Sequence, residues 1–90
     1  MQFEWDPQKA ALNERKHGVT FVEAASIFGD LLARMVDDPD HSQTENRFLL
    51  IGMSSQHRLL IVAFVDHDDT VRIISARALT VAEREAYETA

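Results

Sequence analysis

The chain lacks cysteine altogether, and its 90 residues include only three glycines and two prolines. Without cysteine there is no disulfide, no thiolate ligand for zinc and no cysteine nucleophile. The longest near-apolar run, Leu59 to Val65, is far shorter than the ~20 residues of a membrane-spanning helix. Met1 to Asp6 carries two acids and no apolar run, which is unlike a signal peptide. We therefore expect a soluble protein of the cytoplasm with no membrane partner.

Positive charge is also scarce. Nine Lys and Arg stand against fifteen Asp and Glu, which gives a formal net charge of -6. Most of the excess acid lies in two short segments, Asp37 to Asp40 and Asp66 to Asp69. This balance disfavours a nucleic-acid binder that relies on net charge. A local basic patch remains compatible with it, because exposed charges more than about 8–10 Å apart are largely screened at physiological salt.

The first third of the chain carries the signals of one short strand and two helices. Gln2 to Trp5 alternates polar and apolar residues, as a strand does. A helix is predicted to begin at Asp6-Pro7 and to stop at Gly18. Thr20 and Glu23 form a capping box that begins a second helix, ending near residue 29.

After residue 30 the spacing of the apolar residues changes from that of helices to that of strands. Four apolar runs follow, at residues 31–36, 47–53, 58–65 and 71–76. The short connections between the last three favour antiparallel hairpins. Because Leu59 to Val65 is apolar on both faces, we expect it in the middle of the sheet with both faces covered. A second capping box, Thr80 with Glu83, predicts a final helix. The expected fold is α+β: an antiparallel sheet of about four strands plus a short N-terminal strand, two N-terminal helices and one C-terminal helix, in one domain of residues 1–90.

Several motifs occur together in the order of these elements. They are Phe3-x-Trp5-Asp6, Lys16-His17-Gly18-Val19-x-Phe21-x-Glu23-Ala24, Glu45-x-Arg47, Arg72-Ile73-Ile74-Ser75-Ala76-Arg77 and Thr80-x-x-Glu83-Arg84-x-x-Tyr87. The set resembles the BrnT toxins. The resemblance implies a ribonuclease toxin of a bacterial type II toxin–antitoxin pair with a RelE-like fold. It also implies a BrnA-like antitoxin partner. The toxin would contact operator DNA only indirectly, through that antitoxin.

Cleavage of RNA without a metal needs a base for the ribose 2′-hydroxyl, cations around the phosphate and an acid for the leaving oxygen. Arginine suits the phosphate because its planar fork donates two hydrogen bonds, and histidine suits proton transfer near neutral pH. As catalytic residues we predict Arg72, Arg77 and His17, and as RNA-binding residues Lys16, Arg47 and Arg58. No cofactor and no metal is expected, since the acidic segments 37–41 and 66–69 have the composition of turns.

Each candidate also has a purely structural explanation. Arg72 and Arg77 have opposite parity in a regular strand, so they share a face only if the strand ends or bulges near Ser75-Ala76. Either arginine could simply pair with a carboxylate such as Glu83. Basic residues at positions 16 and 17 complement a helix dipole, and the one at position 47 could be a solvated edge residue.

Two functions remain open at this point. The first is a ribonuclease toxin that stops translation, favoured by the intact pair Arg72 and Arg77. The alternative is a catalytically weakened or inactive toxin-like subunit that retains antitoxin pairing, favoured by the acids at 66–69 and by Ala78-Leu79, where the family is more basic. We expect the antitoxin either to cover the basic residues or to pair with the edge offered by the short N-terminal strand.

Overall fold

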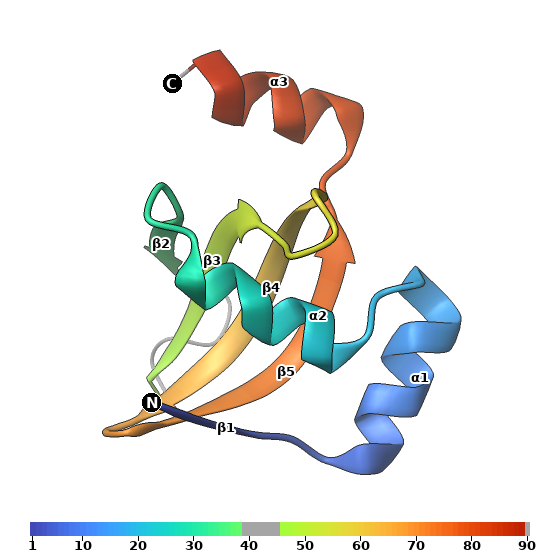
Figure 1. Ribbon diagram of the computed structural model, residues 1–90, viewed down its shortest axis with the longest axis vertical. Coiled ribbons are helices and arrows are strands. Elements are labelled where there is room, and N and C mark those ends of the chain that lie inside the picture. Colours follow the sequence, from blue (N-terminus) through green and yellow to red (C-terminus); the bar gives the residue numbers. More distant parts are fainter. Residues whose placement is uncertain (39–45, 90) are drawn as a thin grey trace.

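The computed structural model describes residues 1–38 and 46–89. They form one five-stranded sheet together with two N-terminal helices and one C-terminal helix (Figure 1). The elements are β1 (Gln2–Glu4), α1 (Pro7–His17), α2 (Phe21–Ser26), a 3₁₀ turn η1 (Ile27–Gly29), β2 (Arg34–Asp37), β3 (Arg47–Met53), β4 (Leu59–His67), β5 (Thr70–Ala78) and α3 (Val81–Thr89). No helix within these described residues has the length and apolar character needed to cross a membrane.

The strands lie in the order β1-β5-β4-β3-β2. The pairs β3–β4 and β4–β5 are antiparallel, as the short connections predict. β2 and β3 are antiparallel as well, whereas β1 runs parallel to β5. The fold is therefore α+β with a mixed sheet. The direction of β1 was beyond the sequence analysis because its partner is distant in the chain and no turn joins the two strands.

Helix α1 begins and ends at the residues that the sequence predicts. The Asp6 carboxylate accepts a hydrogen bond of 2.8 Å from the backbone N–H of Gln8, which would otherwise lack a partner. Gly18 ends the helix with a φ of 68°, a left-handed conformation that glycine adopts without strain. Lys16 and His17 thus occupy its last turn.

Helix α2 and η1 supply the inner layer of the core. Thr20 caps α2 by accepting from the N–H of Glu23 at 3.0 Å. The reciprocal half of the predicted capping box is absent, because the Glu23 carboxylate turns to Arg58 instead. Phe21, Ala24 and Ile27 are buried against the sheet. The core also includes Val19, Leu50, Leu60, Val62, Phe64, Val71, Ile73 and Ala76.

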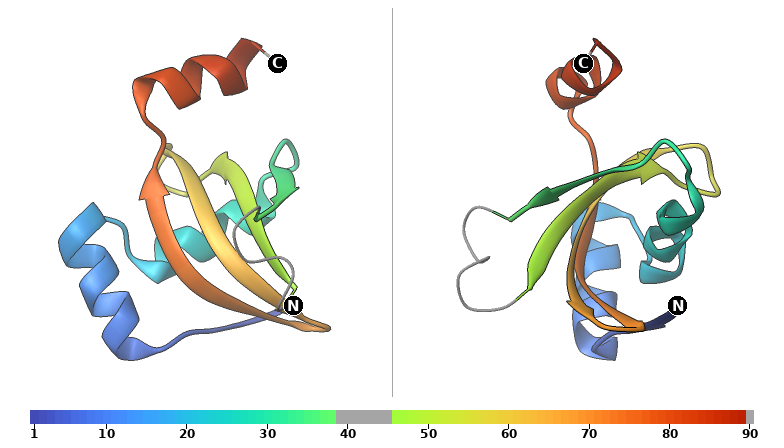
Figure 2. Two further views of the ribbon diagram at one scale, coloured as in Figure 1. Left: turned by 180° about the vertical axis from the view of Figure 1, so that it is seen from behind. Right: turned by 90° about the vertical axis from the view of Figure 1, so that its left-hand side faces the viewer.

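Strand β4 lies between β3 and β5, as its apolar sequence predicts, and the prediction that both of its faces are covered holds fully for one face and in part for the other. Leu60, Val62 and Phe64 are buried on the side of α2. On the second side Val65 is buried, whereas Ile61 and Ala63 are only partly buried. Helices α1 and α2 do not lie over the second side (Figure 2, left), and α3 borders it beside Ile51 and Ile61. We call this side the open face.

Candidate functional site

A bulge in β5 brings two predicted site residues onto the open face. Ala63 of β4 pairs with Ser75 and Phe64 pairs with Ile73, so Ile74 is an extra residue in β5. An extra residue reverses the alternation of side chains beyond it. Arg72 therefore points away from the core before the bulge, and Arg77 points away from it after the bulge. The sequence analysis required a bulge near Ser75-Ala76 for the two arginines to share a face, and the bulge lies at the preceding residue, Ile74.

The strand register shows which side chains share the open face. One row across the sheet is Arg47, Val65 and Arg72, and another is Arg34, Ile51, Ile61 and Arg77. We call Arg34, Arg47, Arg72 and Arg77 the arginine frame. The floor between them consists of Val36, Leu49, Ile51, Ile61, Ala63, Val65 and Ser75. Strands lie about 4.8 Å apart, so the backbones of the frame residues in one row are separated by about 10–14 Å.

Arg34 was missed by the sequence analysis. It lies in the run 31–36 that the sequence predicts to be a strand, but nothing in the local sequence indicates which other residues share its face. The informative signal is its pairing with Ile51, which depends on the three-dimensional register and cannot be read from local composition.

Arg77 is oriented by the first turn of α3. Its two terminal nitrogens donate to the two carboxylate oxygens of Glu83 at 2.7 and 2.9 Å, and Nη1 also donates to the Ala78 carbonyl at 3.3 Å. The side chain is 39% exposed. Within the described residues no hydrogen bond uses its Nε. The edge formed by Nε and the second hydrogen of Nη2 is thus available to a phosphate.

The Arg77–Glu83 pair also shifts the acid–base behaviour of both groups. The two bonds from Arg77 and a further bond from the Thr80 backbone N–H lower the pKa of Glu83 to about 2. The same carboxylate raises the pKa of Arg77 above its ordinary value. Thr80 in turn accepts from the Glu83 N–H at 3.1 Å. The second predicted capping box is complete, and it also fixes the arginine.

Arg72 is held more loosely. Its Nη1 lies 3.8 Å from Glu4 of β1, and the two side chains are 40% and 49% exposed. A solvent-exposed ion pair at that distance contributes little. Arg72 can therefore exchange Glu4 for a phosphate with little energetic cost.

Lys16 and His17 adjoin the open face at the β5 edge. A groove of about 220 Å³ lies between α1 and β5, and its lining includes both residues together with Ile74 and Ser75. Ser75 belongs to the open face between the two predicted catalytic arginines. The structure thus brings His17 to the side of β5 that carries them.

Asn13 joins α1 to β5. Its Oδ1 accepts from the N–H of Ala76 at 3.0 Å, and its Nδ2 donates to the carbonyls of Ala76 and Val19 at 2.8 and 2.9 Å. β1 pairs with β5 only at residues 70–72, so the side chain of Asn13 replaces a neighbouring strand farther along. This residue was missed because an asparagine in a helix carries no signal of a distant partner.

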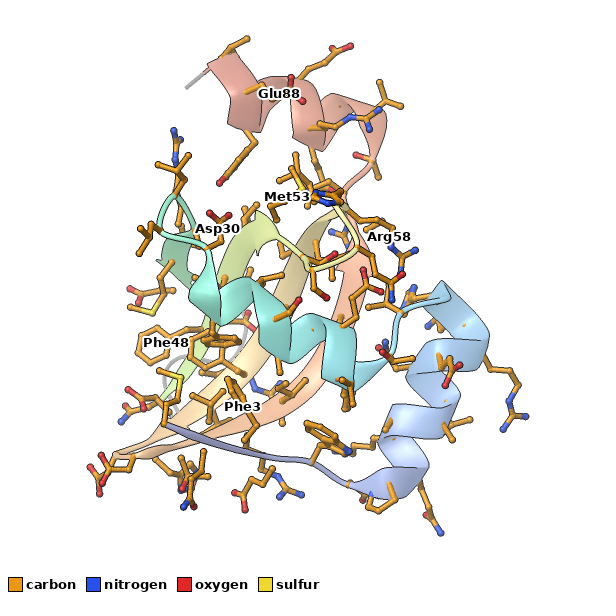
Figure 3. All side chains as sticks on the ribbon, viewed as in Figure 1. Phe3, Asp30, Phe48, Met53, Arg58 and Glu88 are labelled. Carbon is orange, nitrogen blue, oxygen red and sulfur yellow. The ribbon has the colours of Figure 1, made fainter. Side chains whose placement is uncertain are left out.

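Arg58 lies apart from the arginine frame, on the hairpin between β3 and β4 and beside the start of α2 (Figure 3). Its Nε donates to Glu23 at 2.9 Å, and Nη2 bonds the same carboxylate and the Gly18 carbonyl. The Glu23 side chain is 2% exposed. Arg58 lowers the pKa of this buried carboxyl, and Ser54 helps through its hydroxyl. The edge that Arg77 leaves available is therefore occupied in Arg58.

The two acidic segments differ in what is known of them. Residues 66–69 belong to the β4–β5 hairpin, where Asp68 has a φ of 56°. Of the segment 37–41, residues 39–41 lie outside the described residues. In the described ranges, no group of three or more His, Asp or Glu side chains is placed to hold a metal ion.

The fold and the open face define a small α+β protein that presents several arginines on one face of its sheet. A family model described as "Ribonuclease toxin, BrnT, of type II toxin-antitoxin system" matches residues 5–83, and the chain belongs to this family. Membership implies an antitoxin partner.

A solved structure confirms the fold. The ribonuclease toxin BrnT of Brucella abortus is similar to this chain with a TM-score of 0.70 and 23% sequence identity, over 89% of this chain and 97% of that one. No curated protein matches the sequence.

Proposed function

We propose that this protein is a metal-independent endoribonuclease toxin of the cytoplasm that inhibits translation by cleaving single-stranded RNA. The observation that carries the proposal is the bulge at Ile74, because it places Arg72 and Arg77 on one face beside the groove of His17. A BrnA-like antitoxin keeps it inactive, and operator DNA is contacted only through that antitoxin.

The residues suggest an internal transfer at phosphorus. His17 takes the proton of a ribose 2′-hydroxyl, and the 2′-oxygen attacks the adjacent phosphorus. The bond to the 5′-oxygen breaks, and that oxygen leaves as a hydroxyl after taking a proton from water. The products are a 2′,3′-cyclic phosphate and a 5′-hydroxyl end. Arg77 holds the phosphate through its Nε and Nη2 edge, Arg72 adds a second cation, and Lys16 and Arg47 bind the flanking backbone.

The test is cleavage of single-stranded RNA by the purified chain in EDTA, with analysis of the ends. Arg77→Ala should lower the rate by ~10²–10³-fold, as the loss of one transition-state charge does elsewhere. Arg15→Ala is the matched control, since Arg15 is exposed in the last turn of α1 and belongs to no part of the site. Equal rates for the two variants at equal melting temperature would contradict the assignment.

Arg58→Ala is a poor control for the same experiment. It leaves the Glu23 carboxylate buried without its charge partner, which destabilises proteins strongly. We therefore assign Arg58 a structural role rather than an RNA contact.

One observation favours the alternative, a toxin-like subunit with little or no cleavage. Both predicted catalytic arginines already contact carboxylates, Arg77 with Glu83 and Arg72 with Glu4. This alternative predicts no growth arrest when the chain is expressed without its antitoxin, together with intact antitoxin binding. Arrest that depends on Arg77 would exclude it.

A further inference from the structure

The outer edge of β2 is open to a partner. β2 is the last strand of the sheet, and no described residue pairs with its outer side. All four of its residues are exposed, among them Met35 and Val36. A strand edge with exposed apolar side chains is a site at which a further strand adds.

The turn before β2 adds two strongly exposed leucines. Leu31 is 98% exposed and Leu32 is 79% exposed, which is unusual for such large apolar side chains next to each other. We call Leu31, Leu32, Met35 and Val36 the apolar edge. The turn lies at one side of the sheet, near the labelled Asp30 (Figure 3).

Hydrogen bonds hold this turn in place. The Asp30 carboxylate accepts from the N–H of Leu32 at 3.0 Å and from the N–H of Met53 on β3 at 2.8 Å. The Tyr87 hydroxyl of α3 donates to the Leu32 carbonyl at 3.0 Å. The leucines are therefore displayed on an ordered backbone, and a partner that binds them has little ordering to overcome.

A groove continues from this edge beneath α3. Its volume is about 350 Å³, and Arg34 and Val36 of β2 form part of its lining. The remaining lining residues are Ile51, Ile61, Leu79, Glu83, Ala86 and Tyr87. The Arg34 guanidinium lies 5.0 Å from the centre of the Tyr87 ring. The groove is thus apolar inside and carries an arginine where it meets β2.

We propose that the apolar edge is the anchor for the antitoxin. An extended antitoxin segment pairs with β2, contacts Leu31 and Leu32, and places an apolar side chain in the groove beneath α3 and an acidic one near Arg34. The inference rests on the proposed function to the extent that the partner is an antitoxin. The two leucines lie outside the arginine frame, whereas the groove adjoins Arg34 and part of the floor. Variants of the leucines can therefore separate antitoxin binding from RNA cleavage.

Two comparisons favour this occupant and this edge. A second copy of the chain paired at β2, with the two sheets continuous, would bring two Arg34 side chains onto one face within a few residues. Like charges so placed repel, whereas an antitoxin with an acid there is complementary. The opposite edge, β1, has only three residues and carries Glu4 rather than an apolar cluster, which makes it a poorer anchor than the sequence analysis assumed.

The variant that tests the proposal is L31D/L32D. Its matched control is Val22→Asp, since Val22 is an apolar residue on α2 that is 71% exposed. The probe is the protein encoded by the reading frame next to this gene, titrated against the full chain. L31D/L32D should bind it at least ~10-fold more weakly and should no longer be neutralised by it in cells. Without the antitoxin, its RNA cleavage should equal that of the wild type.

Other results would overturn the proposal. If L31D/L32D and Val22→Asp bind like the wild type while Arg72→Glu binds weakly, the anchor lies at Arg72 on β5 and not at the apolar edge. If L31D/L32D converts a dimer of the chain to a monomer and leaves the antitoxin affinity unchanged, the occupant is a second copy. A wild type that cleaves no RNA would contradict the proposed function instead, because the binding measurement would still give its own answer.

Hydrogen exchange of the complex locates the paired strand. Amides of residues 34–37 should exchange more slowly when the antitoxin is bound, and those of residues 2–4 should not change. Protection of residues 2–4 alone would assign the partner strand to β1 and contradict the proposal.

Discussion

Arg58 and Arg77 show that the role of an arginine depends on which edge of its guanidinium group already has a hydrogen-bond partner. Arg58 uses Nε and Nη2 to hold Glu23, so the edge best suited to a phosphate is taken. Arg77 meets Glu83 with its two terminal nitrogens and keeps that edge. The sequence could place both arginines beside strands, but it could not show which nitrogen faces which carboxylate.

Glu83 is therefore expected to act as a positioning residue. Glu83→Gln replaces two charged hydrogen bonds by one neutral bond and lets Arg77 move, so kcat for RNA cleavage should fall by about 10-fold or more. KM should not rise, since a negative charge near the phosphate is lost. Glu85→Gln, an exposed acid on the same helix, is the control. A rise in KM with unchanged kcat would show that Glu83 does not orient Arg77.

Asn13 is the residue on which the junction of α1 with β5 depends. Asn13→Ala leaves the polar backbone groups of Ala76 and the carbonyl of Val19 without their partner in a buried place. Each such group costs about 1–3 kcal/mol, so the loss of these partners should lower the free energy of unfolding by at least about 3 kcal/mol. Urea denaturation measures this. Leu12→Ala, at a position 58% exposed, should change stability little, and an equal effect of both would refute the role.

At the scale of elements, the sequence predicted well those features that depend on neighbouring residues, namely helix ends and hairpins. Asp6 begins α1 and Gly18 ends it, as expected, and the capping box of Thr80 and Glu83 begins α3. The two hairpins follow from short connections. The capping box at Thr20 failed in part because its acid had a stronger, distant partner in Arg58. Tertiary contacts of this kind leave no local trace.

The bulge and the open face also depend on tertiary structure that the local sequence does not indicate. Parity indicated that Arg72 and Arg77 needed a bulge to share a face, but only the register places it at Ile74. The apolar residues of β4 were taken to be covered on both sides. On the open face Ile61 and Ala63 are only partly buried and form part of the floor of the arginine frame, and a sequence cannot distinguish a partly exposed strand face from a fully buried one.

Helix α3 is the element that acid should release first. None of its described residues is buried, and it contacts the rest of the protein through Glu83 and Tyr87. The folded pKa of Glu83, about 2, lies below its ordinary value of 4.5. A depressed pKa stabilises the fold above the ordinary value, and the stabilisation is lost as the pH falls towards the folded value. Between those pH values α3 should loosen while β4 and β5 persist.

Backbone NMR relaxation of residues 81–89 against residues 59–65 checks this expectation. Glu83→Gln provides the control, because it lacks the titrating carboxyl and should show α3 mobility that does not change across the same range. An α3 that stays ordered in the wild type down to the folded pKa would refute the expectation.

For the whole molecule, the question is how a chain with a net charge of -6 can bind a polyanion. The acids at 66–69 lie on the hairpin that joins β4 to β5, beside the row of Arg47 and Arg72, whereas Arg34 and Arg77 belong to the row farther from that hairpin. Screening at physiological salt limits the reach of each charge to about 8–10 Å. The local charge of the open face, rather than the net charge, should then decide RNA binding.

Salt dependence tests that statement. Each phosphate neutralised on a single strand contributes about -0.7 to the slope of log K against log salt, so contacts from the four frame residues and Lys16 predict a slope of about -3.5. Arg72→Ala should reduce its magnitude by about 0.7, whereas Arg15→Ala, which also removes one positive charge, should leave it unchanged. The measurement uses single-stranded RNA with 2′-O-methyl groups, which cannot undergo the internal transfer. Equal reductions for the two variants would mean that diffuse charge governs binding, and the arginine frame would not be the RNA interface.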